Sequence, residues 1–213
     1  FRQGRNCHQA VERVLEIWHQ GYRHVLDADI KGFFDNIPHS VIMTGLTAVV
    51  ADGNILGLVE KFLRAGIMED GVFKPTTVGT PQGGVISPLL ANIALNFLDW
   101  HLDELGFRFV RYADDFVVGF QHREEAERFQ KELCERLRKF GLELHETKTR
   151  LIEFGRFAAS NRRERGKGKP GTFSFLGFTH ICSTTRQGRF KLLRQTKAKK
   201  LRAKLKEVKI ELR

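Results

Sequence analysis

The sequence has 213 residues, of which 41% are hydrophobic and 29% charged, and it carries a net charge of +11 with a pI near 9.9. It is long enough for one folded unit with a sizeable core, and no segment approaches the roughly 20 apolar residues that cross a bilayer, which excludes a membrane-spanning protein and favours a cytoplasmic location. The cysteines Cys7, Cys134 and Cys182 have no spacing typical of a zinc site or a disulfide framework.

The positive charge is concentrated toward the C-terminal end of the chain. Residues 156–213 hold 18 Lys and Arg against three Glu, a net of +15, which leaves −4 for the first 155 residues. Such a basic surface favours a polyanionic partner such as nucleic acid, although a lysine-rich helix that serves only solubility has the same composition.

The first half of the chain predicts a strand followed by helices. Residues 22–30 are a β-type run, and Pro38 is expected at the first position of the helix that follows. A second helix is expected over residues 54–65. After a turn rich in glycine, Ser87 is expected to cap one long helix. That helix should bury an apolar face made by Leu90, Ile93, Ala94, Phe97 and Leu98.

The segment after this helix predicts a hairpin, a helix and a strand. Residues 107–120 indicate two strands that are interrupted at Ala113-Asp114-Asp115, so the two acids should lie at a hairpin tip. Residues 124–140 indicate an amphipathic helix that ends at Gly141. Residues 142–154 return to strand character.

The C-terminal part predicts a loop, a hairpin and a helix. Residues 155–171 are rich in Gly, Arg and Lys and indicate a mobile loop. Strands are expected over residues 173–178 and 188–193, and Thr196 should cap a last helix with an apolar side. The order of the elements favours an α+β fold, in which helices back an antiparallel sheet.

The adjacent acids Asp114 and Asp115 are like charges between two apolar strands, a costly arrangement unless a cation lies between them. Magnesium prefers carboxylate oxygens and substrate phosphates, and two such ions about 3.5 to 4 Å apart can activate a hydroxyl and stabilise a leaving oxygen. Asp29, at the end of the first strand, is the candidate third ligand, whereas Asp35 is expected to cap the next helix. Taken alone, an Asp-Asp pair is more often a solvated turn.

Three longer segments give the pair its context. They are Asp29-Ile30-Lys31-Gly32-Phe33-Phe34-Asp35-Asn36-Ile37, residues 79–93 from Gly79-Thr80-Pro81-Gln82-Gly83-Gly84 onward, and Arg111-Tyr112-Ala113-Asp114-Asp115. In this order they resemble successive motifs of the group II intron reverse transcriptases, also called maturases. The similarity continues through residues 141–149 and 175–178, so it covers nearly the whole chain.

The resemblance implies a right-hand polymerase fold of fingers, palm and thumb. Residues 1–24 would belong to the fingers, residues 25–195 to the palm with embedded fingers elements, and residues 196–213 would begin the thumb. Within the palm, residues 155–171 would form the basic loop, and residues 173–193 a hairpin that includes the family's primer grip. Relatives have a fingers segment before the position of Phe1 and more thumb after Arg213, so this piece alone is expected to extend primers poorly.

The implied activity is that of an RNA-directed DNA polymerase, a nucleotidyltransferase that adds dNTPs to a primer 3′-hydroxyl with two Mg²⁺ ions, for which Mn²⁺ could substitute. The implied partners are an RNA template, a DNA primer, dNTPs and structured intron RNA, with no membrane, and a homodimer is allowed. Two rivals stay open at this point. One is a maturase that binds intron RNA with polymerase activity secondary, and the other is a different enzyme on a palm-like sheet, such as a nucleotide cyclase.

The resemblance also implies roles for single residues. Asp29, Asp114 and Asp115 would be catalytic metal ligands, joined by the Ile30 carbonyl, and Lys148 would protonate the leaving pyrophosphate. Phe34 would exclude the ribose 2′-hydroxyl. The nucleotide contacts would be Ile30, Gly32, Phe33, Phe34, Gln82 and Ala113. The nucleic-acid contacts would be Tyr112, Gly83, Gly84, Phe175, Leu176, Gly177, Arg162, Arg163 and Arg165. The alternatives are a core position for Phe34 and for the phenylalanines of residues 175–178, and a solvated lysine for Lys148.

Overall fold

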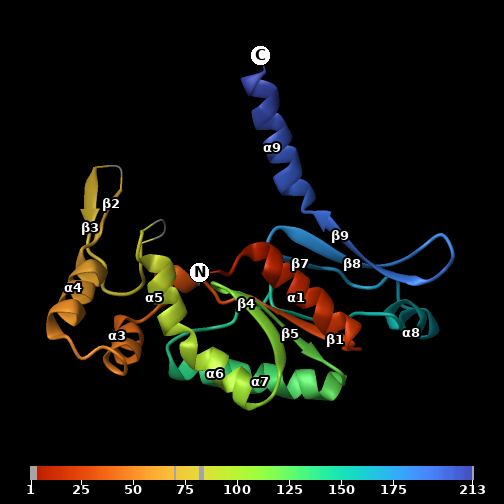
Figure 1. The fold of residues 1–213 in the computed structure, drawn as a ribbon, viewed down its shortest axis with the longest axis horizontal. Coiled ribbons are helices and arrows are strands. Elements are labelled where there is room, and N and C mark those ends of the chain that lie inside the picture. Colours follow the sequence, from red (N-terminus) through yellow and green to blue (C-terminus); the bar gives the residue numbers. More distant parts are fainter. Residues whose placement is uncertain (1–3, 70, 82–83, 213) are drawn as a thin grey trace.

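The fold is built around a four-stranded antiparallel sheet, seen in a computed structural model that describes residues 4–69, 71–81 and 84–212 (Figure 1). The strand order is β4-β5-β1-β6. The strands are β1 (His24–Ala28), β4 (Arg108–Tyr112), β5 (Asp115–Phe120) and β6 (Arg150–Glu153). Helices cover the sheet, so the α+β arrangement expected from the sequence is confirmed.

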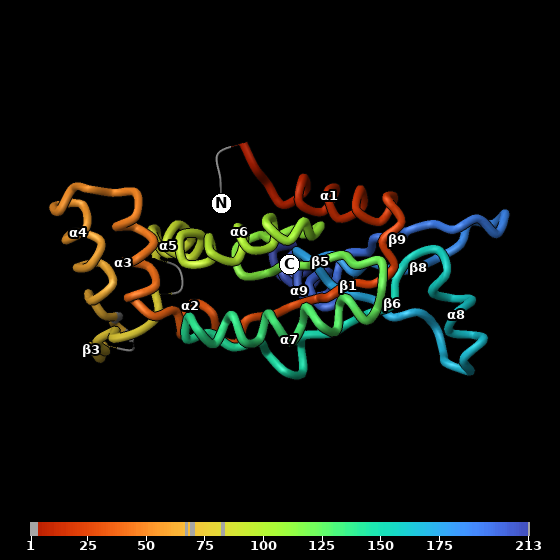
Figure 2. The backbone as a smooth tube through the Cα atoms, turned by 90° about the horizontal axis from the view of Figure 1, so that it is seen from below, coloured from red at the N-terminus to blue at the C-terminus, as the bar shows by residue number. Residues whose placement is uncertain are grey.

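Both faces of the sheet are buried, because successive side chains of a strand point to opposite faces. Leu26 of β1 lies in a core shared with α7 (Arg123–Lys139), whereas the neighbouring Val25 lies in a second core shared with α1 (Cys7–His19). Figure 2 shows α1 and α7 on opposite sides of β1 and β5. The central strand β5 is accordingly buried from Phe116 to Phe120.

Each covering helix presents one apolar face to the sheet. The buried residues of α7 are Ala126, Phe129, Leu133 and Leu137, at the three- and four-residue spacing of a helical face. Helix α1 buries Val11, Val14, Ile17 and Trp18, and it begins with a reciprocal capping box between Asn6 and Gln9. The sequence interpretation did not include α1, although this capping signal precedes it.

A group of short elements extends from one end of the sheet, at the left of Figure 1. They are α2 (Phe33–Asn36), α3 (His39–Thr47), α4 (Gly53–Arg64), β2 (Ile67–Glu69) and β3 (Val72–Lys74). The chain returns to the sheet through α5 (Ser87–Ala94) and α6 (Asn96–Glu104). None of the helices in the described part of the chain is long and apolar enough to span a membrane.

The C-terminal part forms a second sheet, of order β7-β8-β9, at the other end of the molecule. Its strands are β7 (Phe173–Phe175), β8 (Phe178–Thr184) and β9 (Phe190–Thr196), and the helix α8 (Ala158–Glu164) precedes them. Helix α9 (Ala198–Glu211) follows β9 and projects away from the remainder of the molecule (Figure 1). None of the described residues of α9 is buried, so its apolar side, Leu201, Leu205, Val208 and Leu212, faces solvent.

Several predicted boundaries and caps in the first half are wrong. Pro38 is the N-cap of α3 and lies before its first turn, and Asp35 belongs to α2 and does not cap α3. The long helix is two helices that meet at Leu95. Ser87 is inside α5 and does not cap it, because its hydroxyl donates to the Pro81 carbonyl at 2.7 Å.

The C-terminal part differs more. Residues 155–171 contain α8 and are not simply a loop. The sequence did not predict this helix because α8 lacks an apolar stripe. A strand was expected over residues 142–154, but only residues 150–153 form one. Leu144 makes an isolated bridge with Ile30. The expected two-stranded hairpin has three strands, and Thr196 ends β9, leaving α9 without a side-chain cap.

Candidate active site

The three candidate acids lie together at one end of the central sheet. Strands β1 and β5 pair antiparallel with Ala28 opposite Phe116, so the next residue along β1, Asp29, comes level with Asp115. Tyr112 pairs with Asp115 across the β4–β5 hairpin, which leaves Ala113 and Asp114 as its two-residue loop. The register therefore gathers residues that are more than 80 positions apart in the sequence.

The β4–β5 loop has an unusual backbone. Ala113 has φ = 56°, in the left-handed region that a side chain with a Cβ seldom adopts. Such a conformation costs about 1 to 2 kcal/mol and persists only where the surroundings hold it. A hydrogen bond from Arg111 Nη1 to the Ala113 carbonyl, 2.7 Å long, provides a constraint of this kind.

Arg111 links the loop to two helices. Its Nε donates to Asp99 Oδ1 of α6 at 2.6 Å, its Nη2 pairs with Asp99 Oδ2, and its Nη1 donates to Asn92 Oδ1 of α5 at 3.0 Å. The side chain of Arg111 is only 5% exposed and that of Asp99 14%. A buried bidentate pair with further hydrogen bonds is strong and directional. This network thus fixes the position of the loop that carries Asp114 and Asp115.

Partial burial and, to a smaller extent, repulsion between neighbouring carboxylates disfavour ionised acids at this end of the sheet. Partial burial raises the pKa of Asp115 to about 6, with further contributions from the negative charges of Asp114, Asp29 and Asp27. Burial also raises the pKa of Asp114, and the charge of Asp29 adds to the effect. Within the described ranges, neither Asp114 nor Asp115 forms an ion pair. The site thus holds negative charge that a cation would stabilise.

Asp29 is held by the segment that leads into β6. The His145 amide donates to the Asp29 carbonyl at 2.8 Å, and the Asp29 amide donates to Thr149 Oγ1 at 3.3 Å. Lys148 Nζ lies 3.1 Å from Asp29 Oδ2 and is 61% exposed at its side chain. Lys148 therefore lies next to the acids, with its side chain accessible from solvent.

The donor set suits a hard divalent cation in charge and in atom type. Asp114 and Asp115 supply carboxylate oxygens without a counter-charge, and Asp29 supplies a third that Lys148 now contacts. In the part of the chain that the structure describes, no three His, Cys, Asp or Glu side chains already form a closed metal-binding group.

Phe34 lies beside this end of the sheet on α2. Its ring is half-buried against the core and meets Phe33 edge-on with 5.5 Å between the ring centroids. Its carbonyl accepts a hydrogen bond from the Thr80 amide at 2.7 Å, and the Gly79 amide donates to the Ile37 carbonyl at 2.8 Å. The turn at residues 79–80 is thereby docked against α2. Gly79 is required there, because a Cβ would lie 2.6 Å from the Asp35 carbonyl oxygen.

The other residues expected to contact the nucleotide or the nucleic acid differ in burial and backbone conformation, and two of them are not described. Phe33 and Ile30 are buried at 2% and 3% exposure, so their side chains face the core and only their backbone is available to a ligand. Gly32 starts α2 with a left-handed φ of 51°. Gln82 and Gly83 lie outside the described residues. Gly84 is described, and its amide donates to the Pro81 carbonyl at 3.1 Å.

The expected primer grip is the tight turn between β7 and β8. Leu176 and Gly177 have φ values of 49° and 86°, and the Gly177 carbonyl accepts from the Lys197 amide at 2.9 Å. Phe175 is buried in the second core, as the alternative interpretation held. The turn is thus fixed to the start of α9, and only its backbone and Leu176 are available for contact with a primer.

Comparison with known proteins agrees with this geometry. A sequence profile described as "Reverse transcriptase (RNA-dependent DNA polymerase)" matches residues 1–180. The chain belongs to the reverse transcriptase family. This confirms the family that the motifs indicated.

Similar sequences include a group II intron-encoded protein and a second bacterial protein. The group II intron-encoded protein LtrA of Lactococcus lactis is 36% identical over 154 residues, which are 72% of this chain and 25% of LtrA. Protein YkfC of Escherichia coli is 37% identical over 108 residues, 49% of this chain and 28% of YkfC. The chain therefore spans about a quarter of the length of these relatives.

Solved structures show the same fold at low sequence identity. Apo telomerase from Candida tropicalis, truncated from the C-terminal domain, superposes with a TM-score of 0.62 at 11% identity, over 89% of this chain and 39% of that one. Telomerase from Candida albicans gives 0.59 at 15% identity, over 81% and 32%. The polymerase palm expected from the resemblance is confirmed as a fold.

The sequence analysis did not identify the Arg111 network beside the acids, and it treated three arginines of residues 155–171 as one nucleic-acid surface. Arg111 and Asn92 lie within the family motifs, but the motifs assigned no role to them, and Asp99 lies outside those motifs. Arg162, Arg163 and Arg165 are on or next to α8, at the far end of the sheet from the acids. Arg162 Nε donates to the Gly168 carbonyl at 2.9 Å and Arg165 pairs with Glu153, so both are engaged within the protein.

Proposed function

We propose that this chain carries the catalytic palm of an RNA-directed DNA polymerase that adds dNTPs to the 3′-hydroxyl of a primer on an RNA template. The observation that carries the proposal is the register of β1 and β5. It brings Asp29 level with Asp115 and beside Asp114 in a member of the reverse transcriptase family, at an end of the sheet where burial, with added repulsion between the carboxylates, raises the pKa of Asp114 and Asp115.

Asp29, Asp114 and Asp115 would hold two Mg²⁺ ions, or Mn²⁺ in their place, with the Ile30 carbonyl as a further ligand. When bound, the ions supply charge that acidifies the primer hydroxyl and stabilises the triphosphate during an in-line displacement. The chain's own contribution is positioning. Arg111 holds the loop with Asp114 and Asp115, and residues 145–149 hold Asp29.

Lys148 would act as the general acid. Its ammonium group contacts Asp29 and would donate a proton to the departing pyrophosphate. Phe34, at the start of the segment that follows Asp29, would exclude a ribose 2′-hydroxyl with its half-buried ring. The turn at residues 175–178 would support the primer, and Gln82 to Gly84 together with Tyr112 would approach the nucleotide and template.

The remaining expectations follow from the resemblance. Residues 1–24 would be part of the fingers, residues 25–195 the palm, and residues 196–213 the first helix of a thumb, which agrees with the solvent-facing apolar side of α9. A group II intron or related retroelement is the expected source, with a cytoplasmic location and intron RNA as a partner. A role in splicing as an RNA-binding maturase is the second candidate, favoured by the net charge of +15 after residue 155.

The decisive experiment is primer extension on poly(rA) primed with oligo(dT), in Mg²⁺, with the full-length protein. Asp29→Asn should lose at least about a thousandfold in extension rate, more than about 4 kcal/mol of barrier. Asp27→Asn is the matched control, because Asp27 is in β1 two residues before Asp29 and is paired with Arg150 at 3.0 Å. Its rate should stay within a few fold of wild type. Equal losses in both variants, or none in Asp29→Asn, would refute the assignment.

A further inference from the structure

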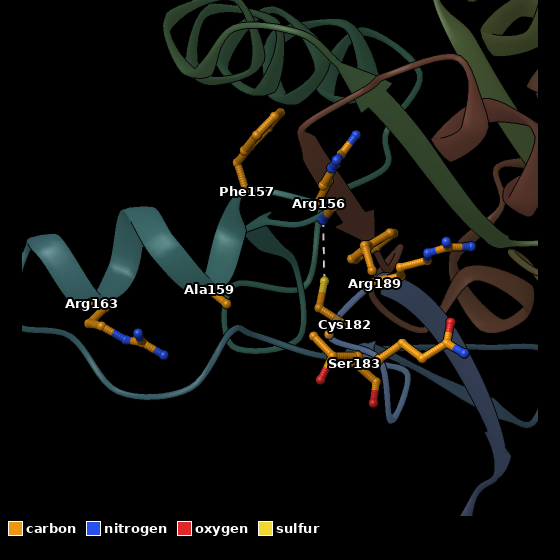
Figure 3. A pocket seen from close by; sticks show the side chains of 12 residues that line it. Arg156, Phe157, Ala159, Arg163, Cys182, Ser183 and Arg189 are labelled. Carbon is orange, nitrogen blue, oxygen red and sulfur yellow. Dashed lines mark hydrogen bonds between the residues drawn. The ribbon is translucent and has the colours of Figure 1, made fainter.

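A positively charged groove lies at the opposite end of the palm sheet from the acids (Figure 3). Strand β6 is antiparallel to β1 with Glu153 opposite His24, so the chain leaves β6 where β1 begins. Asp29 lies five residues further along β1, which at about 3.3 Å per residue separates the two ends by roughly 17 Å. The groove is therefore distinct from the site proposed for polymerisation.

The groove runs between the start of α8 and the tip of the β8–β9 hairpin and has a volume of about 960 Å³. Figure 3 shows Arg163 on the α8 side, Ser183 and Arg189 on the hairpin side, and Arg156 and Phe157 where the chain enters α8. A hydrogen bond from the Gly155 amide to Cys182 Sγ, 3.2 Å long, joins the two walls at the base. The walls are thus connected by the fold itself.

The charge of the groove has one sign. Its lining includes the three guanidinium groups of Arg156, Arg163 and Arg189 and no carboxylate. Among the residues that the structure describes, none of these three forms an ion pair, whereas the adjacent Arg165 pairs with Glu153. Three unpaired cations around one groove attract a polyanion.

The remaining lining distinguishes a nucleic-acid strand from a simple anion. Phe157 is 49% exposed, and the guanidinium groups of Arg23 and Arg156 lie over its ring at 5.5 and 5.8 Å. The hydroxyl and amide groups of Ser183, Thr184 and Gln187 add hydrogen-bonding groups to the hairpin wall. Exposed aromatic rings combined with cations are typical of sites for unpaired strands, whose bases are free to stack. Hydroxyls and amides can contact a ribose 2′-hydroxyl.

We propose that this groove, formed by Arg156, Phe157, Arg163, Ser183 and Arg189, binds an unpaired RNA segment outside the duplex that is being copied. The guanidinium groups contact its phosphates, Phe157 and the arginine planes stack on its bases, and the hairpin wall contacts its 2′-hydroxyls. An RNA held here is fixed relative to the palm through β6 and β8 without occupying the acids. The proposal concerns binding alone and does not rest on polymerase activity.

The experiment measures binding with the catalytic face already occupied. The full-length protein is saturated with an unlabelled primer-template duplex, and fluorescein-labelled oligo(rU) is titrated by anisotropy over a range of salt concentrations. Arg189→Glu is compared with Arg186→Glu, because Arg186 is in the same hairpin turn, is exposed, and does not line the groove. The two variants change the net charge equally.

Arg189→Glu and Arg163→Glu should each weaken oligo(rU) binding at least tenfold and lower the slope of log K against log salt, by about 0.7 for each phosphate that the variant no longer neutralises. Arg186→Glu should change affinity less than threefold. Oligo(dU) and a blunt RNA duplex should bind more weakly than oligo(rU). Asp114→Asn should leave the binding unchanged, which separates failure of this proposal from failure of the polymerase assignment.

Three results would overturn the proposal. Equal losses in Arg189→Glu and Arg186→Glu would show a diffuse field and no groove. Binding of oligo(dU) or duplex as tight as that of oligo(rU) would remove the RNA strand as the occupant. RNA that carries 5-iodouridine should cross-link within residues 155–163 or 182–190, and cross-links confined to other segments would place the strand elsewhere, even if an arginine variant proved unfolded by circular dichroism.

Discussion

The two ends of the palm sheet carry opposite charges, and at both ends unpaired like charges lie close to a paired one. At one end, Asp114 and Asp115 have no ion-pair partner in the described structure, while Asp27 nearby is paired with Arg150. At the other end, Arg156, Arg163 and Arg189 line a groove without a carboxylate, while Arg165 nearby is paired with Glu153. At each end a paired charge adjoins like charges that the protein leaves uncompensated.

For Asp114, Asp115 and the groove arginines, this contrast separates charges that are available to a ligand from paired charges that serve the fold; Asp29, which contacts Lys148, is the exception. Holding like charges together without a partner costs stability, so such a cluster is informative where a paired charge is not. The two ends differ in how firmly the charges are placed. The acids lie at or next to strand ends fixed by the sheet register and by the buried Arg111, whereas the arginines are exposed on α8, on the segment before it and in the β8–β9 turn. Metal ligands require such precision, and phosphate contacts tolerate more freedom.

The largest effect is expected from neutralising the loop acids. Asp114→Asn or Asp115→Asn should reduce primer extension by about a thousandfold or more, because each removes a proposed metal ligand.

The same substitutions should make the apo protein more stable above pH 6. The folded-state pKa of Asp115 is raised to about 6, so its ionisation opposes folding as the pH rises to that value, and the full cost is present above it.

The check is thermal unfolding of the apo protein at pH 7 beside single-turnover extension. Loss of activity together with a higher Tm supports a functional acid cluster. Loss of both would mean that Asp115 instead stabilises the hairpin, and the comparison between the two ends would fail.

A smaller effect is expected from the residue that positions the loop. Arg111→Lys keeps the charge but cannot make the bidentate contact with Asp99 and also reach Asn92 and Ala113. Extension should fall about 10- to 100-fold, because misplacing reacting groups by about 1 Å costs on this scale. The fall should be in kcat at saturating dNTP, with the apparent requirement for Mg²⁺ increased.

Arg108→Lys is the matched control, since Arg108 is on the same strand and exposed. A loss of activity in Arg111→Lys that only follows the fraction of unfolded protein would indicate a purely structural role for the network.

A more selective change is expected at the nucleotide side. Phe34→Ala opens space beside the acids, so the preference for dNTP over rNTP should fall by on the order of tenfold, while Phe34→Tyr should preserve it because it keeps the bulk. Steady-state extension with each nucleotide gives the ratio. An unchanged ratio in a folded Phe34→Ala protein would assign Phe34 to the core alone.

The sequence predicted the β4–β5 hairpin and helix α7 well, because the evidence for these elements is local and periodic. The strands around Ala113-Asp114-Asp115 alternate with helical segments of clear amphipathicity, and the family motifs fall on these elements. Asp29 was proposed as the third acid from its place at the end of the first strand, and the resemblance agreed, but the non-local pairing that brings it level with Asp115 was not predicted. Arg111 was not singled out because a buried arginine and an exposed one look alike in a sequence.

The basic end was predicted poorly for a physical reason. Helix α8 has the sequence Ala-Ala-Ser-Asn-Arg-Arg-Glu, without an apolar stripe, so tertiary contacts such as that of Asn161 with Glu153 decide its structure. Strand β8 was missed because its polar residues interrupt the alternation. The sequence analysis treated Arg162, Arg163 and Arg165 as one surface because it relied on composition. Composition cannot distinguish a guanidinium group that binds within the protein from one that does not.

The smallest effect should separate those arginines. Arg165→Ala should lower the free energy of unfolding by about 0.5 to 1 kcal/mol, because Arg165 is 44% exposed and pairs with a Glu153 that is 11% exposed. Its effect on oligo(rU) affinity should be less than threefold, since the charge it removes is already paired. Arg163→Ala should do the reverse, with stability unchanged and RNA binding weakened. Urea unfolding and the anisotropy assay on both variants give the comparison. If Arg165→Ala weakens RNA binding as much as Arg163→Ala does, then pairing within the protein does not identify the arginines that serve the fold, and the rule drawn from the two ends of the sheet is wrong.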